Sequence, residues 1–139
     1  MICFYTDDTA LPAFDENRTI AWIKETAALY SKKSGRINYI FCSDRRILEI
    51  NNQYLSHNYY TDIITFDYSL GSIISGDIFV GLETVKSNSN KEKTDFDEEL
   101  RRVIIHGILH LCGQNDKKPD EKKEMTKQEN MALARFEND

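Results

Sequence analysis

The stretch V-I-I-H-G-I-L-H-L-C-G-Q-N-D, from Val103 to Asp116, decides the fold of this chain. Its apolar residues nearly encircle a helix, and a helix that is apolar on all sides belongs at the centre of a fold. His106 and His110 are four residues apart, so on a helix both imidazoles lie on one face, one turn apart. Gly113 can adopt the left-handed conformation that ends a helix, after which the chain can bring Asp116 back. The stretch therefore predicts a buried helix whose end gathers three polar side chains.

These three side chains have the chemistry of a zinc site. Two imidazoles and one carboxylate are accepted zinc ligands, and three protein ligands leave a fourth position open, as in catalytic sites. The alternative is that the histidines have ordinary hydrogen-bond partners, since leaving one buried without a partner costs about 1–3 kcal/mol. Cys112 is not expected to join the site, because it lies about 200° around the helix from His110. Asp120 and Glu121 are alternatives to Asp116, although they resemble the start of another helix.

The rest of the chain alternates strand and helix patterns. Strands are predicted at residues 2–6, 36–43, 61–68 and 72–82, with the last two close enough for a hairpin. Helices are predicted from 15 to a stop at Gly35, from 44 to 55, briefly from Glu83 until the polar run 87–93, from 95, and from Pro119. The expected fold class is therefore α/β (α+β), with a small mixed sheet of about four strands packed with about five helices. Residues 1–139 are expected to form a single domain.

Composition narrows the class of protein. The formal net charge of −5 argues against a surface that binds nucleic acid everywhere, although it leaves room for a local basic groove. The sequence has neither an apolar run near the ~20 residues of a membrane span nor the pattern of a secretory signal. Cys3, Cys42 and Cys112 are odd in number and form no close pair. We therefore expect reduced thiols, no membrane contact and a cytoplasmic protein.

The spacing of the histidines also bears on a protease interpretation. The pattern H-x-x-x-H-x-x-G-x-x-D is similar to the zincin pattern H-E-x-x-H-x-x-G-x-x-H. Gly107 occupies the position of the glutamate that serves zincin proteases as general base. Peptide hydrolysis by the usual route therefore lacks its proton acceptor here.

A longer resemblance is more specific. H-G-I-L-H-L-C-G-Q-N-D (106–116) resembles the signature H-G-x-L-H-L-x-G-Y-D-H of the YbeY family, which are bacterial metal-dependent endoribonucleases. I-N-N-Q-Y-L (50–55) resembles the family's L-N-x-x-Y-R, T-D-I-I-T-F (61–66) its T-D-V-L-S-F, and S-G-D-I-F-V (75–80) its G-D-I block. The resemblance covers residues 50 to 120 and follows the family's order.

This resemblance implies a zincin-like fold with the metal helix in the core, one zinc ion and single-stranded RNA as substrate. It further implies a role in 16S rRNA 3′-end maturation and ribosome quality control in the cytoplasm, with the small ribosomal subunit as partner. His106 and His110 match the first two metal ligands, and Asp116 falls where the family has a third histidine. Because a carboxylate makes the site less positive than an imidazole, manganese or nickel is an alternative to zinc.

The remaining site residues are hypotheses. Leu55 replaces the family's arginine, and His57 is a candidate cation or proton donor in its place, or else a plain loop residue. Asp77 is a candidate proton acceptor or ligand-orienting group, or else a turn residue beside Gly76. Candidate RNA contacts are Arg101, Arg102, Lys117 and Lys118, with Tyr59, Tyr60 and Tyr68 as candidate base-stacking rings. The rival functions are a peptidase-like metal hydrolase and a non-catalytic, ribosome-associated metal-binding module.

Overall fold

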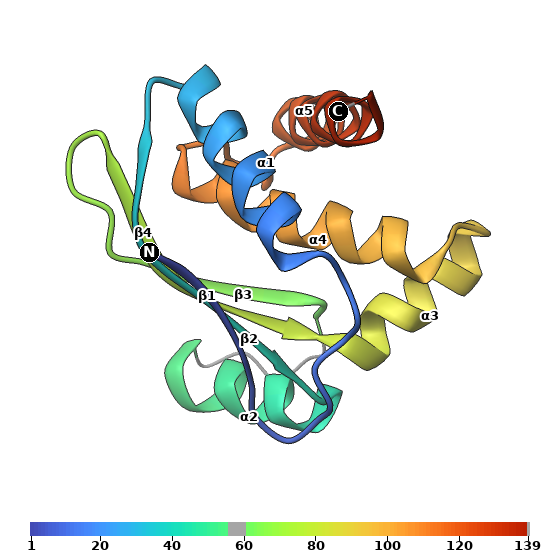
Figure 1. The fold of residues 1–139 in the computed structure, drawn as a ribbon. Coiled ribbons are helices and arrows are strands. Elements are labelled where there is room, and N and C mark those ends of the chain that lie inside the picture. Colours follow the sequence, from blue (N-terminus) through green and yellow to red (C-terminus); the bar gives the residue numbers. More distant parts are fainter. Residues whose placement is uncertain (56–60, 139) are drawn as a thin grey trace.

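A four-stranded mixed sheet separates the helices into two layers (Figure 1). The structure is a computed structural model that describes residues 1–55 and 61–138. The strands are β1 (Ile2–Thr6), β2 (Lys33–Cys42), β3 (Ile63–Asp67) and β4 (Ile73–Gly81), in the spatial order β1-β2-β4-β3. β2 pairs in parallel with both β1 and β4, whereas β3 is an antiparallel edge strand beside β4. The predicted fold class and the predicted hairpin are thus confirmed; the single-domain assignment stays a prediction.

The helices cover the sheet unequally. They are α1 (Glu16–Leu29), α2 (Asp44–Leu55), α3 (Leu82–Glu92), α4 (Phe96–Leu111) and α5 (Pro119–Asn138). α1, α3, α4 and α5 share the main core with one face of the sheet, and α2 packs a smaller apolar cluster on the other face (Figure 1). Among the described residues, no helix has an apolar run sufficient to cross a membrane.

α4 is the central helix, as its sequence predicts. Nine of its residues are buried, including Val103, Ile104 and Ile105. Gly107 lets this helix approach the sheet closely: a Cβ atom there would lie 3.0 Å from Ile78 Cδ1 and 3.2 Å from Ile63 Cδ1. A larger side chain at this position would have to push α4 away from β3 and β4. The close packing of α4 on the sheet therefore favours a small residue at this position of the H-G-I-L-H sequence.

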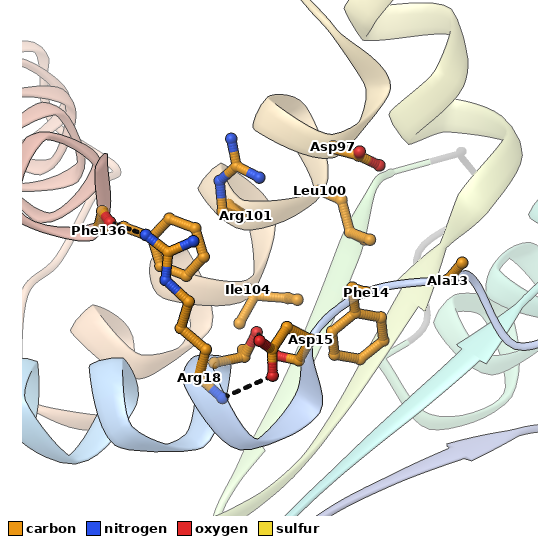
Figure 2. A pocket seen from close by; sticks show the side chains of 10 residues that line it. Ala13, Phe14, Asp15, Arg18, Asp97, Leu100, Arg101, Ile104 and Phe136 are labelled. Carbon is orange, nitrogen blue, oxygen red and sulfur yellow. Dashed lines mark hydrogen bonds between the residues drawn. The ribbon is translucent and has the colours of Figure 1, made fainter. Parts of the chain in front are cut away.

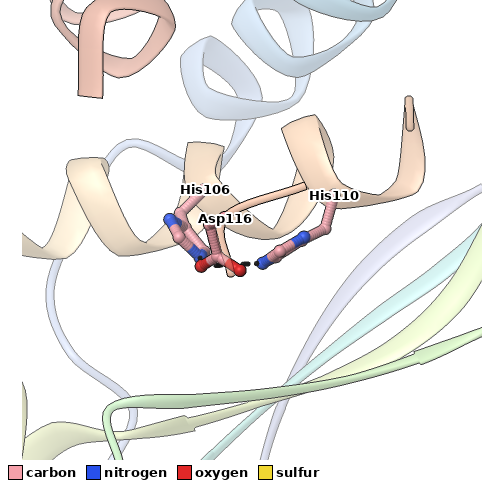
Figure 3. Close-up of side chains that lie close together, drawn as sticks. All are labelled: His106, His110 and Asp116. Carbon is pink, nitrogen blue, oxygen red and sulfur yellow. Dashed lines mark ion pairs between the residues drawn. The ribbon is translucent and has the colours of Figure 1, made fainter. Parts of the chain in front are cut away.

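The end of α4 also follows the prediction. Gly113 has a φ of +103°, which favours glycine. Its N–H donates to the His110 carbonyl over 2.9 Å, and the Gln114 N–H donates to the Leu109 carbonyl over 2.9 Å. These two bonds form a Schellman motif, which satisfies the last carbonyls of the helix. After this turn, Asp116 lies beside the two histidines of α4, and Pro119 then begins α5 (Figure 3).

Two predicted boundaries are wrong. α1 ends at Leu29, and Gly35 lies within β2 instead of ending the helix. A Cβ atom at Gly35 would lie 2.5 Å from Ser75 Oγ, so glycine is needed for the close approach of β2 and β4 where their register shifts. The polar run 87–93 does not break α3 before Glu92. Within it, Ser89 is buried and its hydroxyl donates to the Lys86 carbonyl over 2.7 Å, so the helix satisfies this side chain internally.

Strand alternation assigns the side chains of β4 to opposite faces. Ile74, Ile78 and Val80 are buried in the main core with α4. Phe79 packs against the smaller cluster with α2. Because successive strand side chains point to opposite faces, Asp77 shares the α2 face with Phe79.

Candidate metal centre

The three predicted ligands meet at the C-terminal end of α4. His106 and His110 project from one face of the helix, and the chain after Gly113 brings the Asp116 carboxylate between their rings (Figure 3). Asp116 Oδ2 lies 3.3 Å from His106 Nε2 and 3.4 Å from His110 Nε2. One ligand atom from each residue lies within 4.8 Å of the other two. The helical spacing and the turn thus create one cluster of three donors.

The spacing of these donor atoms fits a small divalent cation. Donors that bind zinc at 2.0–2.1 Å in a tetrahedron lie about 3.3–3.4 Å from one another. The two distances from Asp116 Oδ2 to the imidazole nitrogens equal this edge length, and the three donor atoms as a set lie within a looser 4.8 Å of one another. Two neutral nitrogens and one carboxylate oxygen also suit zinc chemically. The residues present therefore fit a metal with at least one further position open.

An open hollow is lined by two of these three residues, His110 and Asp116. It has a volume of about 610 Å³ and lies between the end of α4 and the edge strand β3. Its lining comprises Asn51, Thr61, Ile63, Ile64, Thr65, Asp67, His110, Asn115, Asp116 and Lys117. A substrate lying along β3 would therefore pass beside His110 and Asp116.

The pKa values of the two histidines are shifted in opposite directions. Burial favours the neutral form of His106, but the hydrogen bond and charge of Glu129, with the charges of Asp116 and Asp62, outweigh it and raise the pKa of His106 above 6.5. Burial, with the charge of His106, lowers the pKa of His110 below 6.5. Asp116 counteracts this shift without reversing it. The pair therefore divides into one basic and one readily neutral imidazole.

Two carboxyl groups near the cluster, Glu129 and Asp62, are not among the site residues predicted from the sequence. Glu129 of α5 is 7% exposed, and its Oε2 lies 2.5 Å from His106 Nδ1. Burial raises the pKa of Asp62, partly offset by the charge of His106. A signal for Glu129 exists in the sequence: it stands four residues after Met125 and four before Leu133, within the buried stripe of α5. A glutamate in such a stripe requires a partner.

Arg101 and Arg102, predicted as RNA contacts, lie on different sides of α4. Arg101 lines a separate pocket of about 150 Å³ between α1, α4 and α5, with its Cζ 4.7 Å from the centre of the Phe136 ring (Figure 2). Arg18 Cζ also lies over this ring, at 3.9 Å. Arg102 is one turn before His106 but is paired with Glu129 over 2.9 Å. The structure does not bring Arg101 to the metal cluster.

The two lysines after the cluster are exposed. Lys117 lines the hollow directly beside Asp116. The backbone N–H of Lys118 donates to Glu121 Oε1 over 2.9 Å, which holds Glu121 at the start of α5. Asp116 is therefore the acid that reaches both histidines, in preference to the alternatives Asp120 and Glu121. Burial raises the pKa of the Cys112 thiol to about 11, which keeps it a poor metal ligand at neutral pH.

Asp77 and Tyr68 are placed away from the cluster. Both line a pocket of about 350 Å³ on the α2 face of the sheet, together with Tyr54, Phe66 and Phe79. Asp77 Oδ1 accepts a hydrogen bond of 3.0 Å from Asn38 Nδ2. The candidates His57, Tyr59 and Tyr60 lie outside the described residues. The structure thus unites the predicted ligands and Lys117, but not Asp77, Tyr68 or Arg101.

Comparisons with known proteins identify the family. A family model described as Endoribonuclease YbeY matches residues 4–137. A relative with the name Endoribonuclease YbeY from Parabacteroides distasonis is 57% identical over 133 residues, which cover 96% of this chain and 94% of the relative. Another of the same name, from Porphyromonas gingivalis, is 43% identical over 96% of this chain and 88% of its own length.

A solved structure is similar in fold. The solution structure of a protein from Thermotoga maritima matches with a TM-score of 0.66 and 24% identity, covering 98% of this chain and 89% of that one. The resemblance seen in the sequence blocks is confirmed by the extent of these matches. The chain therefore belongs to the YbeY family of endoribonucleases.

Proposed function

We propose that this protein is a zinc-dependent endoribonuclease that cleaves single-stranded RNA in the cytoplasm, in 16S rRNA 3′-end maturation and ribosome quality control. The observation that carries the proposal is the convergence of His106, His110 and Asp116 beside an open hollow, which His110 and Asp116 line. Membership of the family and the names of its relatives support the same activity. The free thiols of Cys3, Cys42 and Cys112 agree with a reducing compartment.

The donor set favours zinc, with manganese and nickel as alternatives. A divalent cation held by the three ligands would supply positive charge to a phosphoryl oxygen and make water a better nucleophile. The chain's own residues fix where that charge lies. His110, with its lowered pKa, is available as a neutral ligand near pH 7. The carboxylate of Asp116, in contact with both rings, keeps the three donors converged.

The hollow and its rim suit one strand of RNA. It follows the edge strand β3, so an extended chain can lie along it and present a phosphate to the ligand cluster. Lys117, beside Asp116, offers a cation to a neighbouring phosphate. Arg102 is a weaker candidate for this role because Glu129 and Asn130 already engage its guanidinium.

The test is cleavage by the purified, zinc-loaded protein of an RNA that covers the 3′ end of 16S rRNA. We expect cleavage of the single strand, little cleavage of the same sequence in a duplex, and loss of activity on chelation with recovery on adding Zn²⁺. His110→Ala should lose both zinc and cleavage. Unchanged cleavage by this variant would refute the proposal.

The same preparation distinguishes the rival functions. Cleavage of peptides but not RNA by the zinc-loaded protein would indicate a peptidase, in spite of Gly107. Zinc binding without cleavage of either polymer, together with unfolding on chelation, would indicate a non-catalytic metal-binding module.

A further inference from the structure

A side chain from α5 contacts His106 through the ring nitrogen that does not face Asp116. Glu129 is a buried carboxylate whose two oxygens have different partners. Oε2 lies 2.5 Å from His106 Nδ1, and Oε1 accepts a hydrogen bond of 2.9 Å from Arg102 Nη1. Arg102 is itself fixed by a 2.8 Å hydrogen bond from Nη2 to Asn130 Oδ1. His106, Arg102, Glu129 and Asn130 thus form one connected array between α4 and α5.

This contact decides which nitrogen of His106 can bind a metal. A neutral imidazole carries one N–H donor and one lone-pair acceptor. A carboxylate accepts hydrogen bonds, so Glu129 selects the form of His106 with the proton on Nδ1. The lone pair is then on Nε2, the nitrogen that faces Asp116. The contact also fixes the rotation of the imidazole ring about the bond that joins it to Cβ.

We propose that Glu129 is a positioning residue of the metal centre, which fixes the tautomer and orientation of His106 and is itself held by Arg102. This inference rests on the metal site of the proposed function. It adds a role for α5, because one end of the array is a metal ligand and the other is anchored in that helix. Carboxylates that accept from a metal-binding histidine raise its basicity and commonly contribute 10–100-fold to metal affinity.

The principal test is the zinc affinity of variants, measured by competition with a chromophoric chelator. Glu129→Gln keeps the shape but not the charge, and we expect about tenfold weaker Zn²⁺ binding; Glu129→Ala should approach 100-fold. Arg102→Met leaves His106 in contact with a less restrained Glu129, so this variant should lose less zinc affinity than Glu129→Gln. Glu124→Gln is the matched control, since this glutamate lies on the same helix and contacts Gln128 instead.

A second measurement needs no variant. In the zinc-loaded wild-type protein, nitrogen NMR of the imidazoles should show His106 protonated on Nδ1 and coordinated through Nε2. In the variants, the absorption spectrum of bound Co²⁺ should change for Glu129→Gln but not for Glu124→Gln. A purely structural ion pair between Arg102 and Glu129 would not alter this spectrum.

The outcomes separate the two proposals. If the wild-type protein binds zinc but Glu129→Gln binds it within twofold of the same affinity, the positioning role is refuted and the proposed function stands. Coordination of His106 through Nδ1 would refute the role equally. If the wild-type protein does not bind zinc, the metal centre itself is wrong and both proposals fall.

Discussion

The two faces of the sheet carry acidic residues in contrasting settings. On the α4 face, Asp116 lies within 3.4 Å of both histidine side chains and opens onto the hollow along β3. On the α2 face, Asp77 accepts a hydrogen bond from Asn38 and lines a pocket whose other walls include Phe66 and Tyr68. Both carboxylates belong to sequence blocks that resemble the family. Only Asp116 reaches the two histidines of α4.

The contrast between Asp116 and Asp77 follows from how the chain positions each carboxylate. His106, His110 and Asp116 are neighbours because a helical turn and a Schellman turn place them together. Asp77 depends on strand alternation, which directs it to the face that α2 covers. Chemistry can therefore be assigned to an acidic residue only after its face is known.

The largest effect should come from the residue that brings α4 onto the sheet. Gly107→Glu would restore the glutamate of the zincin pattern, but its Cβ would already lie 3.0 Å from Ile78. Overpacking costs about 1–3 kcal/mol, and an unpaired buried carboxylate adds several more. We expect the free energy of unfolding, measured in urea, to fall by more than about 3 kcal/mol. Gly107→Ala is the size control and should lose about 0–2 kcal/mol, since alanine favours the helix. Wild-type stability of Gly107→Glu would show that α4 has room on this face.

The next effect compares the two carboxylates directly. Asp116→Asn removes a charged ligand, so zinc affinity should fall by more than the roughly 100-fold that marks the loss of a supporting residue. Asp77→Asn keeps its shape and its contact with Asn38, so zinc affinity and RNA cleavage should remain within twofold and stability within about 1 kcal/mol. The measurements are chelator competition and cleavage of the single-stranded RNA. If Asp77→Asn stops cleavage while zinc affinity persists, the predicted catalytic role of Asp77 is correct and the contrast between the faces is wrong.

The sequence predicts the α4 region best because its signals are short-range. Apolar positions, two histidines and Gly113 are all within one helix and its turn, and they specify a buried helix and its end. The strands were also predictable from alternation and turn residues. The end of the first helix is predicted wrongly at Gly35, because a glycine that ends a helix cannot be distinguished in sequence from a glycine that lets two strands approach.

The contacts that escaped prediction join distant segments. Glu129 reaches His106 from α5, 23 residues later in the chain. Arg101 stacks on Phe136 of α5, and nothing near Arg101 in the sequence reveals this ring. Such pairings depend on how α4 and α5 pack, which local patterns do not encode.

A smaller effect concerns pH and the two imidazoles of the α4 face. In the metal-free protein, the raised pKa of His106 gives stability that is complete below 6.5 and is lost as pH rises through its folded-state pKa. The lowered pKa of His110 gives stability above 6.5 that is lost as pH falls through its folded-state pKa. Zinc binds a histidine only through an unprotonated nitrogen. As the pH is lowered, the affinity for zinc should therefore begin to fall while the pH is still above 6.5, where His106 takes up a proton.

Proton NMR of the two rings in the metal-free protein checks this order, and chelator competition over the same pH range checks the affinity. His106 should lose its proton at a higher pH than His110. The reverse order, or zinc affinity that stays constant down to pH 6.5, would contradict the charge environment assigned to Glu129 and Asp116.

The smallest effect compares two cations on different sides of α4. Lys117 lines the hollow beside Asp116, so Lys117→Ala should weaken RNA binding several-fold and reduce the slope of log affinity against log salt by about one. Arg101 stacks on Phe136 away from the cluster, so Arg101→Ala should lower stability by about 0.5–1 kcal/mol and leave RNA binding unchanged. Fluorescence anisotropy of a labelled single-stranded RNA at several KCl concentrations measures both variants. An equal loss of affinity and slope in Arg101→Ala would mean that the RNA also passes over the pocket between α1, α4 and α5, and the substrate path would then extend well beyond the hollow along β3.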